Sequence, residues 1–303
     1  MSAWDVAHDE HPESGRCDMA GEPIVDDPVG VEPAEKTGLR NAWGRIALPY
    51  EEMFAERMRH LTARGLDLLA PLPDWDGLDV ACGPGVTTAA LADRLPAGRA
   101  MGVDFAEAMV ARAQERFARP GLTFAVDDAE RLSQPTASFG AVTCSFGLMY
   151  CYDARAALGH MARVLAPGGR LMLLVWGRAP RVWWSPVIEL IESRADYYVS
   201  ICPMMFFYGL PGVLAGMATE VGLAVVHDEA LDERMAFPSI DEAVDTAIAG
   251  GPLAGLYTNR LDAGRRAEVR RLLADHLSAL AEPADGHILL PAEIRIVVAE
   301  TSS

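Results

Sequence analysis

The stretch Leu78-Asp79-Val80-Ala81-Cys82-Gly83-Pro84-Gly85 decides the fold of this 303-residue chain. Its first four residues form a short apolar run typical of a buried strand, and the Gly-Pro-Gly turn leads directly into an alanine-rich helical segment over 86–95. A strand that turns on glycines and feeds a helix places bare backbone N–H groups over one small space, which predicts a cofactor cradle. Asp79 inside this cradle favours a cationic ligand, because a fixed carboxylate would repel a phosphate.

Strands and helices alternate from Gly77 to Trp176. This spacing predicts βαβ repeats in a parallel sheet, with right-handed crossovers that place helices on both faces. A ligand is expected at the carboxyl ends of the strands. The expected strands are Leu78–Ala81, Ala100–Val103, Leu122–Val126, Ala141–Ser145 and Leu171–Val175, and the expected helices are 86–95, 106–118 and 153–165.

The pattern becomes irregular after Trp176. We expect a helix over 211–221, a strand at Leu223–His227, helices over 239–249 and 262–281, and a last strand at Ile294–Val298. The fold class is therefore α/β: a doubly wound, seven-stranded, mostly parallel sheet with helical lid insertions. The core comprises 39–177, 211–238 and 291–303, and the insertions that build the substrate lid are 178–210 and 239–290.

The N-terminal region has two parts. Residues 1–38 contain ten acidic residues, two basic residues and four prolines, which is typical of a disordered acidic tail. Over 41–70 the residues Phe54, Met58, Leu61, Gly65 and Leu68 share one helical face, and Pro71 and Pro73 end that helix. A helix ahead of the first strand can lie across the mouth of the cofactor site.

Composition excludes several classes of protein. A net charge of −17 argues against binding of a nucleic-acid backbone, which requires basic patches. We expect no membrane span, because no apolar run approaches the ~20 residues that a span needs. The polar N-terminus does not resemble a secretory signal, and the five scattered cysteines form no CxxC pair, so we expect a cytoplasmic protein with reduced thiols and no metal site.

Three acidic residues mark three consecutive strand ends. Asp79 lies at the first, Asp104 ends the second and Asp128 follows the third. Asp104 stands where an acidic side chain would accept hydrogen bonds from ribose hydroxyls, and Asp128 with Ala129 could contact an adenine amino group. Any one of these aspartates could instead be a helix cap or a turn residue.

With these motifs in place, the chain resembles the class I S-adenosylmethionine-dependent methyltransferases, closest to their ubiquinone/menaquinone-biosynthesis-like small-molecule branch. The resemblance is good over 41–176 and loose over 211–298. Two departures are Gly140, where relatives usually have aspartate, and Met149-Tyr150, where many relatives have a histidine pair. The motifs that carry the resemblance are 78–85, Gly102-Val-Asp104-Phe105, Val126-Asp-Asp-Ala-Glu130, Ala141–Gly147 and Leu165–Leu171.

The resemblance implies S-adenosylmethionine as cofactor and a role for each matching residue. Asp79, Ala81 and the backbone of Gly83 and Gly85 would hold its amino-acid end, and Asp104 would bind the ribose. The remaining implied contacts are Phe105 and Met109 beside the adenine, Asp128 and Ala129 at its edge, Ser145 near the methionine portion, and Trp43 or Tyr50 closing over the cofactor.

Methyl transfer from a sulfonium needs near-attack geometry and exclusion of water, and a base only where the methyl acceptor must lose a proton. The weak candidates for a base are Tyr150, Asp153 and His287, each of which could also be an ordinary packed or surface residue.

An aromatic cluster in the first insertion suggests where the methyl acceptor binds. We expect Trp183, Trp184, Tyr198, Phe207 and Tyr208, together with Tyr150, to line a pocket for a flat or apolar small molecule. The alternatives are that these aromatics form the core of the lid itself or a homodimer contact.

The function predicted is S-adenosylmethionine-dependent methylation of a small apolar or aromatic metabolite, at oxygen or carbon. Two alternatives stay open: an enzyme that uses this cofactor for cyclisation or decarboxylation, and a non-enzymatic binding protein. A nicotinamide dinucleotide is disfavoured, because Thr88 replaces the third glycine of its fingerprint and Asp79 would repel the pyrophosphate.

Removal of residues 1–36 is expected to leave the melting temperature and the cofactor affinity nearly unchanged, because a solvated tail contributes little to a packed core. Thermal melting and calorimetric titration of the full-length and shortened chains measure both quantities. A large loss of either would show that the tail is structural.

Overall fold

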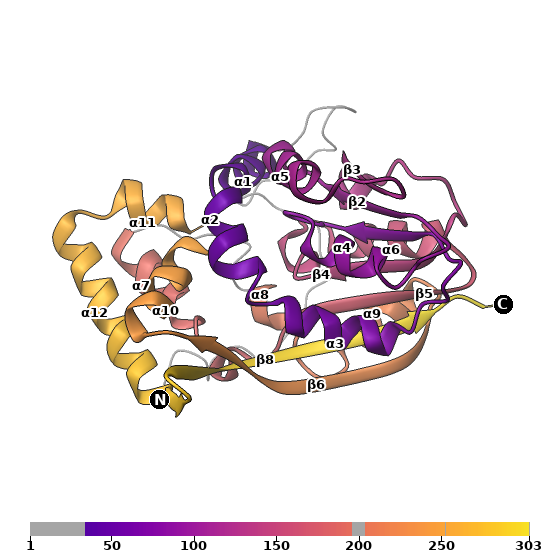
Figure 1. Cartoon of the computed structure of the whole chain (residues 1–303). Coiled ribbons are helices and arrows are strands. Elements are labelled where there is room, and N and C mark those ends of the chain that lie inside the picture. The colour runs from indigo at the N-terminus through magenta and orange to yellow at the C-terminus, as the bar shows by residue number, and fades with distance from the viewer. Residues whose placement is uncertain (1–33, 196–203, 252, 303) are drawn as a thin grey trace, which may run out of the picture. The chain divides into compact units, whose positions relative to one another are not determined.

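One mixed sheet organises the computed structural model, which describes residues 34–195, 204–251 and 253–302 (Figure 1). The chain divides into two units, 1–37 and 38–303, and only 34–37 of the first are described. The strands are β1 (Gly77–Val80), β2 (Ala100–Asp104), β3 (Leu122–Val126), β4 (Phe139–Ser145), β5 (Leu165–Trp176), β6 (Ala224–Phe237), β7 (Glu282–Ala284) and β8 (His287–Glu300).

The strand order is β3-β2-β1-β4-β5-β8-β6, and β7 pairs with β8 beside this path. Strands β1 to β5 are mutually parallel, and β8 runs antiparallel to both β5 and β6. The α/β class and the mostly parallel sheet are confirmed, with the short β7 as an eighth strand that the sequence does not reveal.

The helical segments alternate with the strands and then gather near the C-terminus. They are α1 (Ala34–Arg45), α2 (Ala47–Tyr50), the π-helix η1 (Glu51–Ala55), α3 (Arg59–Leu69), α4 (Val86–Ala92), α5 (Glu107–Phe117), η2 (Ala129–Arg131), η3 (Leu148–Tyr150), α6 (Ala154–Val164), η4 (Ala179–Arg181), α7 (Pro186–Ala195), α8 (Met204–Phe207), α9 (Val213–Glu220), α10 (Ile240–Ala249), α11 (Ala254–Arg260) and α12 (Ala263–Leu280).

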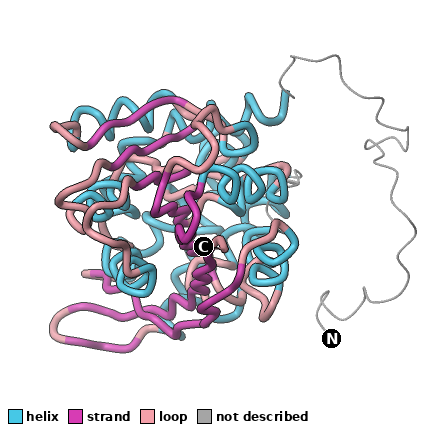
Figure 2. The backbone as a smooth tube through the Cα atoms, turned by 90° about the vertical axis from the view of Figure 1, so that its right-hand side faces the viewer, coloured by secondary structure: helices cyan, strands magenta, loops and turns pink. Residues whose placement is uncertain are grey.

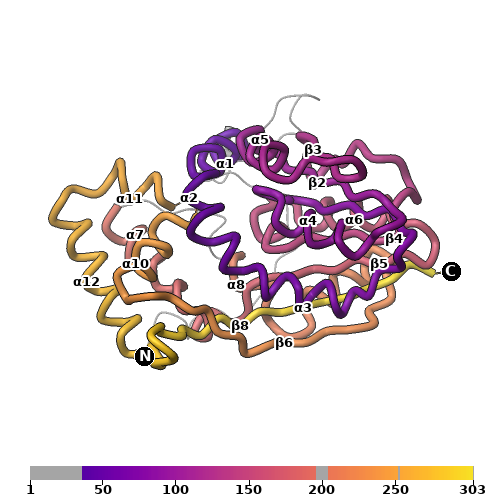
Figure 3. Tube along the Cα trace, in the orientation of Figure 1, coloured from indigo at the N-terminus to yellow at the C-terminus, as the bar shows by residue number. Residues whose placement is uncertain are grey.

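Helices cover both faces of the sheet, as the right-handed crossovers require (Figure 2). Helices α3 and α4 pack against each other, α3 against β5 and β8 and α4 against β1 and β2 (Figure 3). Helices α6 and α9 likewise contact each other, α6 lying on β5 and α9 on β6 and β8. The strands between these layers are almost fully buried: no residue is more than 2% exposed from Leu171 to Trp176 of β5, or more than 6% exposed from Ala292 to Ala299 of β8.

Strands β6 and β8 are much longer than the predicted Leu223–His227 and Ile294–Val298. They pair antiparallel from Ala224–Glu300 to Phe237–Ile288 and form what we call the ribbon. Strand β6 is an edge strand that contains the consecutive acidic residues Asp228-Glu229 and Asp232-Glu233. These charged pairs hide most of the strand from a search for apolar runs, because an edge strand near solvent can carry charged residues.

Four helices, α7, α10, α11 and α12, pack together at the far end of the ribbon, and we call them the cap (Figure 1). In α12 the residues Val269, Leu273 and Leu277 are fully buried at a spacing of four, so one stripe of this helix faces the rest of the cap. Helix α10 also contacts η1, which joins the cap to the N-terminal helices.

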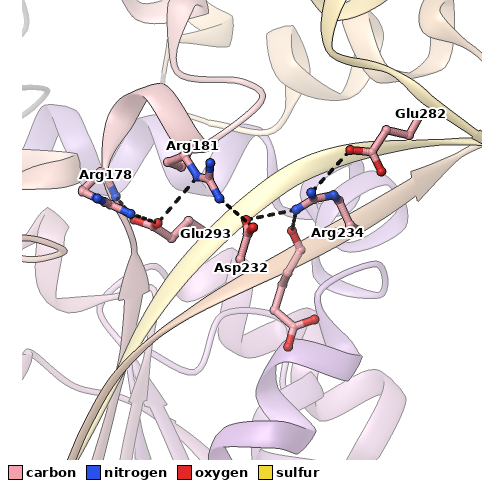
Figure 4. A network of polar contacts seen from close by, with 7 residues as sticks. Arg178, Arg181, Asp232, Arg234, Glu282 and Glu293 are labelled. Atoms are coloured by element: carbon pink, nitrogen blue, oxygen red, sulfur yellow. Dashed lines mark hydrogen bonds and ion pairs between the residues drawn. The ribbon is translucent and has the colours of Figure 1, made fainter.

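A chain of ion pairs fastens the loop after β5 to the ribbon (Figure 4). Glu293 on β8 is buried and accepts hydrogen bonds from the backbone and guanidinium of Arg178, at 2.8 and 2.5 Å. The neighbouring Arg181 contacts Glu293 and pairs with Asp232 on β6 at 2.6 Å. Arg234 then joins Asp232 to Glu282 of β7. The network lowers the pKa of Glu293, mainly through its hydrogen bond to Arg178, so this carboxylate stays ionised.

The N-terminal helix predicted over 41–70 is interrupted. The chain adopts a π-helical turn at η1 before it resumes as α3, which ends at Leu69 ahead of Pro71 as expected. Phe54, Met58 and Leu61 are buried as their spacing predicts. A repeat of 3.6 residues cannot distinguish a π-turn from an α-turn, so the sequence pattern missed the irregularity.

Within the described part of the chain, no helix is long and apolar enough to cross a membrane.

Candidate functional site

Asp79 lies beneath the glycine turn, in the middle of the sheet. Its side chain is 1% exposed, and its two carboxylate oxygens accept hydrogen bonds from the hydroxyls of Thr88 and Thr143, each at 2.7 Å. Thr143 is the register partner of Asp79 on β4, and Thr88 projects from α4. The carboxylate therefore joins two strands and a helix under the turn, while the direct contact with a cofactor that the resemblance implies stays a prediction.

The turn above Asp79 has the backbone conformation that glycine permits. Gly83 and Gly85 have φ values of +54° and +88°, in the left-handed region. A Cβ on Gly85 would lie 2.9 Å from the Cβ of Ala113 and 3.0 Å from the ring of Phe124, so no side chain fits there. Ala81 also has a positive φ of 56°, a strained value for a residue with a side chain, at the point where β1 enters the turn.

Asp104 closes the turn from the side. At the end of β2 it is 7% exposed, and its oxygens accept hydrogen bonds from the backbone N–H groups of Gly83 and Ala106, both at 2.9 Å. Each oxygen keeps a second lone pair, so the carboxylate can also accept from a vicinal diol. Burial raises the pKa of Asp104 to about 6.

Asp128 lies at the same edge of the sheet. Strand β3 is in register with β2 up to Asp104–Val126, and the N–H of Asp127 donates to the Asp104 carbonyl at 3.1 Å. The Asp128 carboxylate caps the short helix η2 by accepting from the N–H of Glu130 at 3.0 Å. The three strand-end aspartates thus converge, and Asp128 is a helix cap as well as a residue beside the site.

Ser145 ends β4 on this edge. Its hydroxyl is buried, and no described residue hydrogen-bonds to it. The next residue, Phe146, has a φ of +57°, and its ring packs on Trp176 at 4.6 Å between centroids. A buried hydroxyl without a partner is costly in an apolar setting, so it suits a site that a polar ligand fills.

Aromatic and apolar side chains from the N-terminal helices and α5 form a wall beside the turn. Trp43 and Met109 are buried in one cluster that Phe105 also contacts. The Tyr50 ring packs edge-on against Trp43 at 5.2 Å, and a Cβ on Gly83 would lie 3.9 Å from Tyr50 Cε1. Four predicted cofactor residues are thereby brought together, Trp43, Tyr50, Phe105 and Met109.

A pocket opens on the other side of Tyr50. It is partly open to solvent, and its lining residues come from the sheet, η1, the cap and the segments that join them. Its described lining carries no charged side chain. The lining residues are Tyr50, Phe54, Met58, Phe146, Tyr150, Trp176, Trp184, Val187, Ile188, Met205, Ala247, Gly250, Gly251 and Leu253.

Two of the predicted pocket residues line this pocket, and the others lie elsewhere. Tyr150 and Trp184 line it, whereas Trp183 is fully buried against Phe237 and donates its indole N–H to Met235 Sδ at 3.4 Å. Tyr208 is buried and Phe207 is exposed, both outside the lining, and Tyr198 lies outside the described residues. The alternative of a homodimer contact through these aromatics stays a prediction.

The candidate bases occupy three different settings. Tyr150 lies beside the pocket, with its ring 4.8 Å from that of Trp43. Asp153 caps α6, accepting from the N–H of Ala156 at 2.9 Å. His287 is exposed in the β7–β8 hairpin and is not part of the pocket lining.

Sequence reasoning missed the places of Thr88, Thr143 and Phe54 at the site. The two threonines could have been found from their offsets, because Thr88 faces back toward the strand from the first turn of its helix and Thr143 sits opposite Asp79 in a parallel register. Phe54 comes from a segment distant in the sequence, and no local pattern links it to the pocket.

The geometry defines a class of protein. A glycine turn after β1, a carboxylate after β2 with free lone pairs and a second carboxylate after β3 meet at one edge of a doubly wound sheet, an arrangement typical of adenosyl-binding sites. Such a site with an adjoining apolar pocket fits a transferase that brings a small molecule to the cofactor.

Comparison with known proteins agrees with a transferase, and the relatives found are methyltransferases. A methyltransferase domain model matches residues 78–169. Nocamycin O-methyltransferase of Saccharothrix syringae is 30% identical over 255 residues, which cover 78% of this chain and 90% of that protein. Demethylmenaquinone methyltransferase of Beutenbergia cavernae is 41% identical over 134 residues, or 44% of this chain and 51% of that protein.

A solved structure shares the fold at low sequence identity. Phosphoethanolamine N-methyltransferase 2 of Haemonchus contortus, in complex with S-adenosyl-L-methionine, has a TM-score of 0.58 at 18% identity, covering 91% of this chain and 62% of that one. The chain belongs to the S-adenosylmethionine-dependent methyltransferases, and S-adenosylmethionine is its cofactor.

Replacement of Asp104 by alanine is expected to weaken binding of S-adenosylhomocysteine by on the order of 1–3 kcal/mol, because two charge-assisted hydrogen bonds to the ribose are lost. Calorimetric titration measures the affinity, and a thermal melt checks that the turn still folds without the Gly83 contact. Unchanged affinity in a folded variant would contradict the assignment of Asp104.

The buried Asp79 predicts a specific pH dependence. Burial raises its pKa to about 7, whereas an unfolded aspartate titrates near ~3.9. At a pH between these two pKa values, Asp79 is protonated in the folded state and ionised in the unfolded state. Its contribution to the free energy of unfolding therefore decreases as the pH rises. Relative to Asp79→Asn, the cofactor-free wild type should lose on the order of 1–3 kcal/mol of unfolding free energy between about pH 5.5 and about pH 8.

Urea unfolding at each pH measures this difference. The exposed Asp93→Asn is the matched control, and its curve should run parallel to that of the wild type. Parallel curves for Asp79→Asn and the wild type would show that Asp79 is ionised throughout this range.

Proposed function

We propose that this methyltransferase acts on a small, largely apolar molecule that contains an aromatic or quinone-like ring. The supporting observation is the pocket beside Tyr50, whose described lining is aromatic and aliphatic without one charged side chain. A methyl acceptor with a localised charge, such as an ammonium or phosphate group, would lose its hydration there with no ion-pair partner in the lining, which costs several kcal/mol, whereas the charge of an enolate is spread over its ring system. The names of the curated relatives, a nocamycin and a demethylmenaquinone methyltransferase, agree with this class.

The site residues would hold the cofactor in the way the motifs imply. Asp104 would accept hydrogen bonds from the ribose hydroxyls, and the Gly83 and Gly85 backbone would leave room for the amino-acid end. Ser145, whose buried hydroxyl lacks a partner among the described residues, would hydrogen-bond the methionine portion. Asp79 would act from below by fixing the turn. When bound, the cofactor supplies an electrophilic methyl group on a sulfonium.

Catalysis would rest on alignment and on exclusion of water. Tyr50 borders both the glycine turn and the pocket, and it packs in parallel with Phe54, with ring centroids 5.9 Å apart. A methyl acceptor stacked against these rings would face the sulfonium in a dry environment, where near-attack geometry lowers the barrier.

The pocket favours an acceptor that needs no strong base. Among the described lining residues only Tyr50 and Tyr150 carry a titratable group. Burial and the nearby Asp104 charge raise the pKa of Tyr50, so its hydroxyl stays protonated and can donate a hydrogen bond but not accept a proton at neutral pH. The reacting atom should therefore ionise readily by itself, as an acidic phenol or enol does, which favours oxygen or an activated carbon.

Incubation with S-adenosylmethionine and matched candidate acceptors tests this proposal. Lawsone, a hydroxynaphthoquinone with an acidic enol, should be methylated faster than naphthol, a weakly acidic phenol of the same ring size. Phosphoethanolamine and glycine should give no product. Release of S-adenosylhomocysteine and the mass of the product are measured together. A product without S-adenosylhomocysteine would favour cyclisation or decarboxylation, and methylation of the charged amines alone would contradict the proposal.

A substitution in the pocket lining tests whether the acceptor binds in this pocket. Ile188→Asp places a carboxylate in the apolar lining and should lower turnover of lawsone at least about tenfold, since an unpaired charge there costs more than ~1.4 kcal/mol. Val226→Asp, on the exposed edge strand β6, is the control and should leave turnover unchanged. Equal rates for the two variants would place the acceptor outside this pocket.

A further inference from the structure

A buried acidic residue lies at the start of η1, outside every motif considered so far. Glu51 is 5% exposed, and its two carboxylate oxygens accept hydrogen bonds from Arg112 Nε at 2.9 Å and Arg116 Nη1 at 2.8 Å. Both arginines project from α5 and are about one third exposed. A buried carboxylate without such partners would be strongly unfavourable, so these pairs decide where the η1 backbone can lie.

The segment that Glu51 anchors carries the two rings that face the two binding sites. Tyr50, the preceding residue, packs against the glycine turn at Gly83. Phe54, three residues later, lines the acceptor pocket and packs so tightly on the cap that a Cβ on Gly250 would lie 2.3 Å from its ring. A shift of η1 would therefore move both rings together.

The local backbone cannot hold this arrangement by itself. Residues 51–55 form a π-helix, a rare and intrinsically weaker turn that often occurs at functional sites. Tertiary contacts must then select it over the α-helix that would rotate Tyr50 and Phe54 relative to each other. The two ion pairs of Glu51 supply such contacts on one side.

Helix α5, which carries the two arginines that pair with Glu51, also borders the predicted cofactor site. Helix α5 follows directly after Asp104 and carries Met109, which packs in the same cluster as Trp43. Glu51 therefore ties the segment that carries Tyr50 and Phe54 to the helix that carries the predicted adenine contact.

We propose that Glu51 is a positioning residue for methyl transfer. Its ion pairs to Arg112 and Arg116 hold Tyr50 against the glycine turn and Phe54 in the acceptor pocket, and so they align the methyl donor with the acceptor. This proposal rests on the proposed function of the pocket as the acceptor site.

Glu51→Gln tests the proposal with little change of shape. A neutral amide replaces the carboxylate that pairs with both arginines, and the arginines, each about one third exposed, can turn toward water. Affinity for S-adenosylhomocysteine, measured by calorimetry, and affinity for menadione, measured by quenching of tryptophan fluorescence, should each fall about tenfold. In turnover of lawsone, kcat should fall together with these affinities.

Glu115→Gln is the matched control. Glu115 pairs with the same Arg112 at 2.6 Å, but it is 70% exposed and lies on α5 away from η1. This variant should retain both affinities within about twofold, as exposed pairs contribute little. Arg112→Lys, which keeps the charge and loses the fork geometry, should show a smaller effect in the same direction as Glu51→Gln.

The outcomes separate positioning from stability. The measurements are made at a temperature where the Glu51→Gln variant is folded. If this variant has a lower melting temperature but unchanged affinities and kcat, the proposal is overturned. Equal effects of Glu115→Gln would also overturn it. If Glu51→Gln does not fold, Arg112→Lys decides by the same two affinities. Neither affinity requires turnover, so a wild type that binds both probes but methylates no acceptor refutes the proposed function and leaves this test valid.

Discussion

The hydrogen bonds from Thr88 and Thr143 to the buried carboxylate of Asp79 are the constraint on which the site depends. They join β1, α4 and β4 directly beneath the glycine turn, and they give each carboxylate oxygen of Asp79 a hydrogen-bond partner within the protein. Helix α4 must lie close to the sheet for Thr88 to reach, and Gly102 permits this, because a Cβ there would lie 2.7 Å from Thr88 Oγ1. The turn is thus held from below, and Asp104 holds it from the side.

An uninterrupted series of ring contacts leads from the cofactor wall to the cap. It passes from Trp43 to Tyr50, then Phe54, Trp176 and Trp184, with neighbouring centroids 5.2 to 6.1 Å apart. These contacts pack the pocket lining against the wall beside the glycine turn, so a change in the position of one ring affects its neighbours.

Sequence predicted the parallel half of the sheet, the glycine turn and Asp104, because these depend on short-range patterns of apolar runs and turn residues. It could not predict η1, whose π-turn has the same apolar spacing as a helix. It found only short parts of the two ribbon strands, because the charged runs Asp228-Glu229 and Asp232–Arg234 interrupt the apolar pattern of β6. The neighbours Trp183 and Trp184 show the limit most clearly. Val182 bridges Ala292 in an extended conformation, so successive side chains point to opposite sides, Trp183 toward Met235 of β6 and Trp184 toward the pocket.

The edge strand β6 leaves its outer row of backbone N–H and C=O groups unpaired in the sheet order, and such a row can accept a strand from another chain. Carboxylates on this strand, such as Glu229 and Glu233, repel that approach while they are ionised. Near the isoelectric point of about 4.8 this repulsion weakens, so acidic solution favours aggregation at an exposed strand edge of this kind.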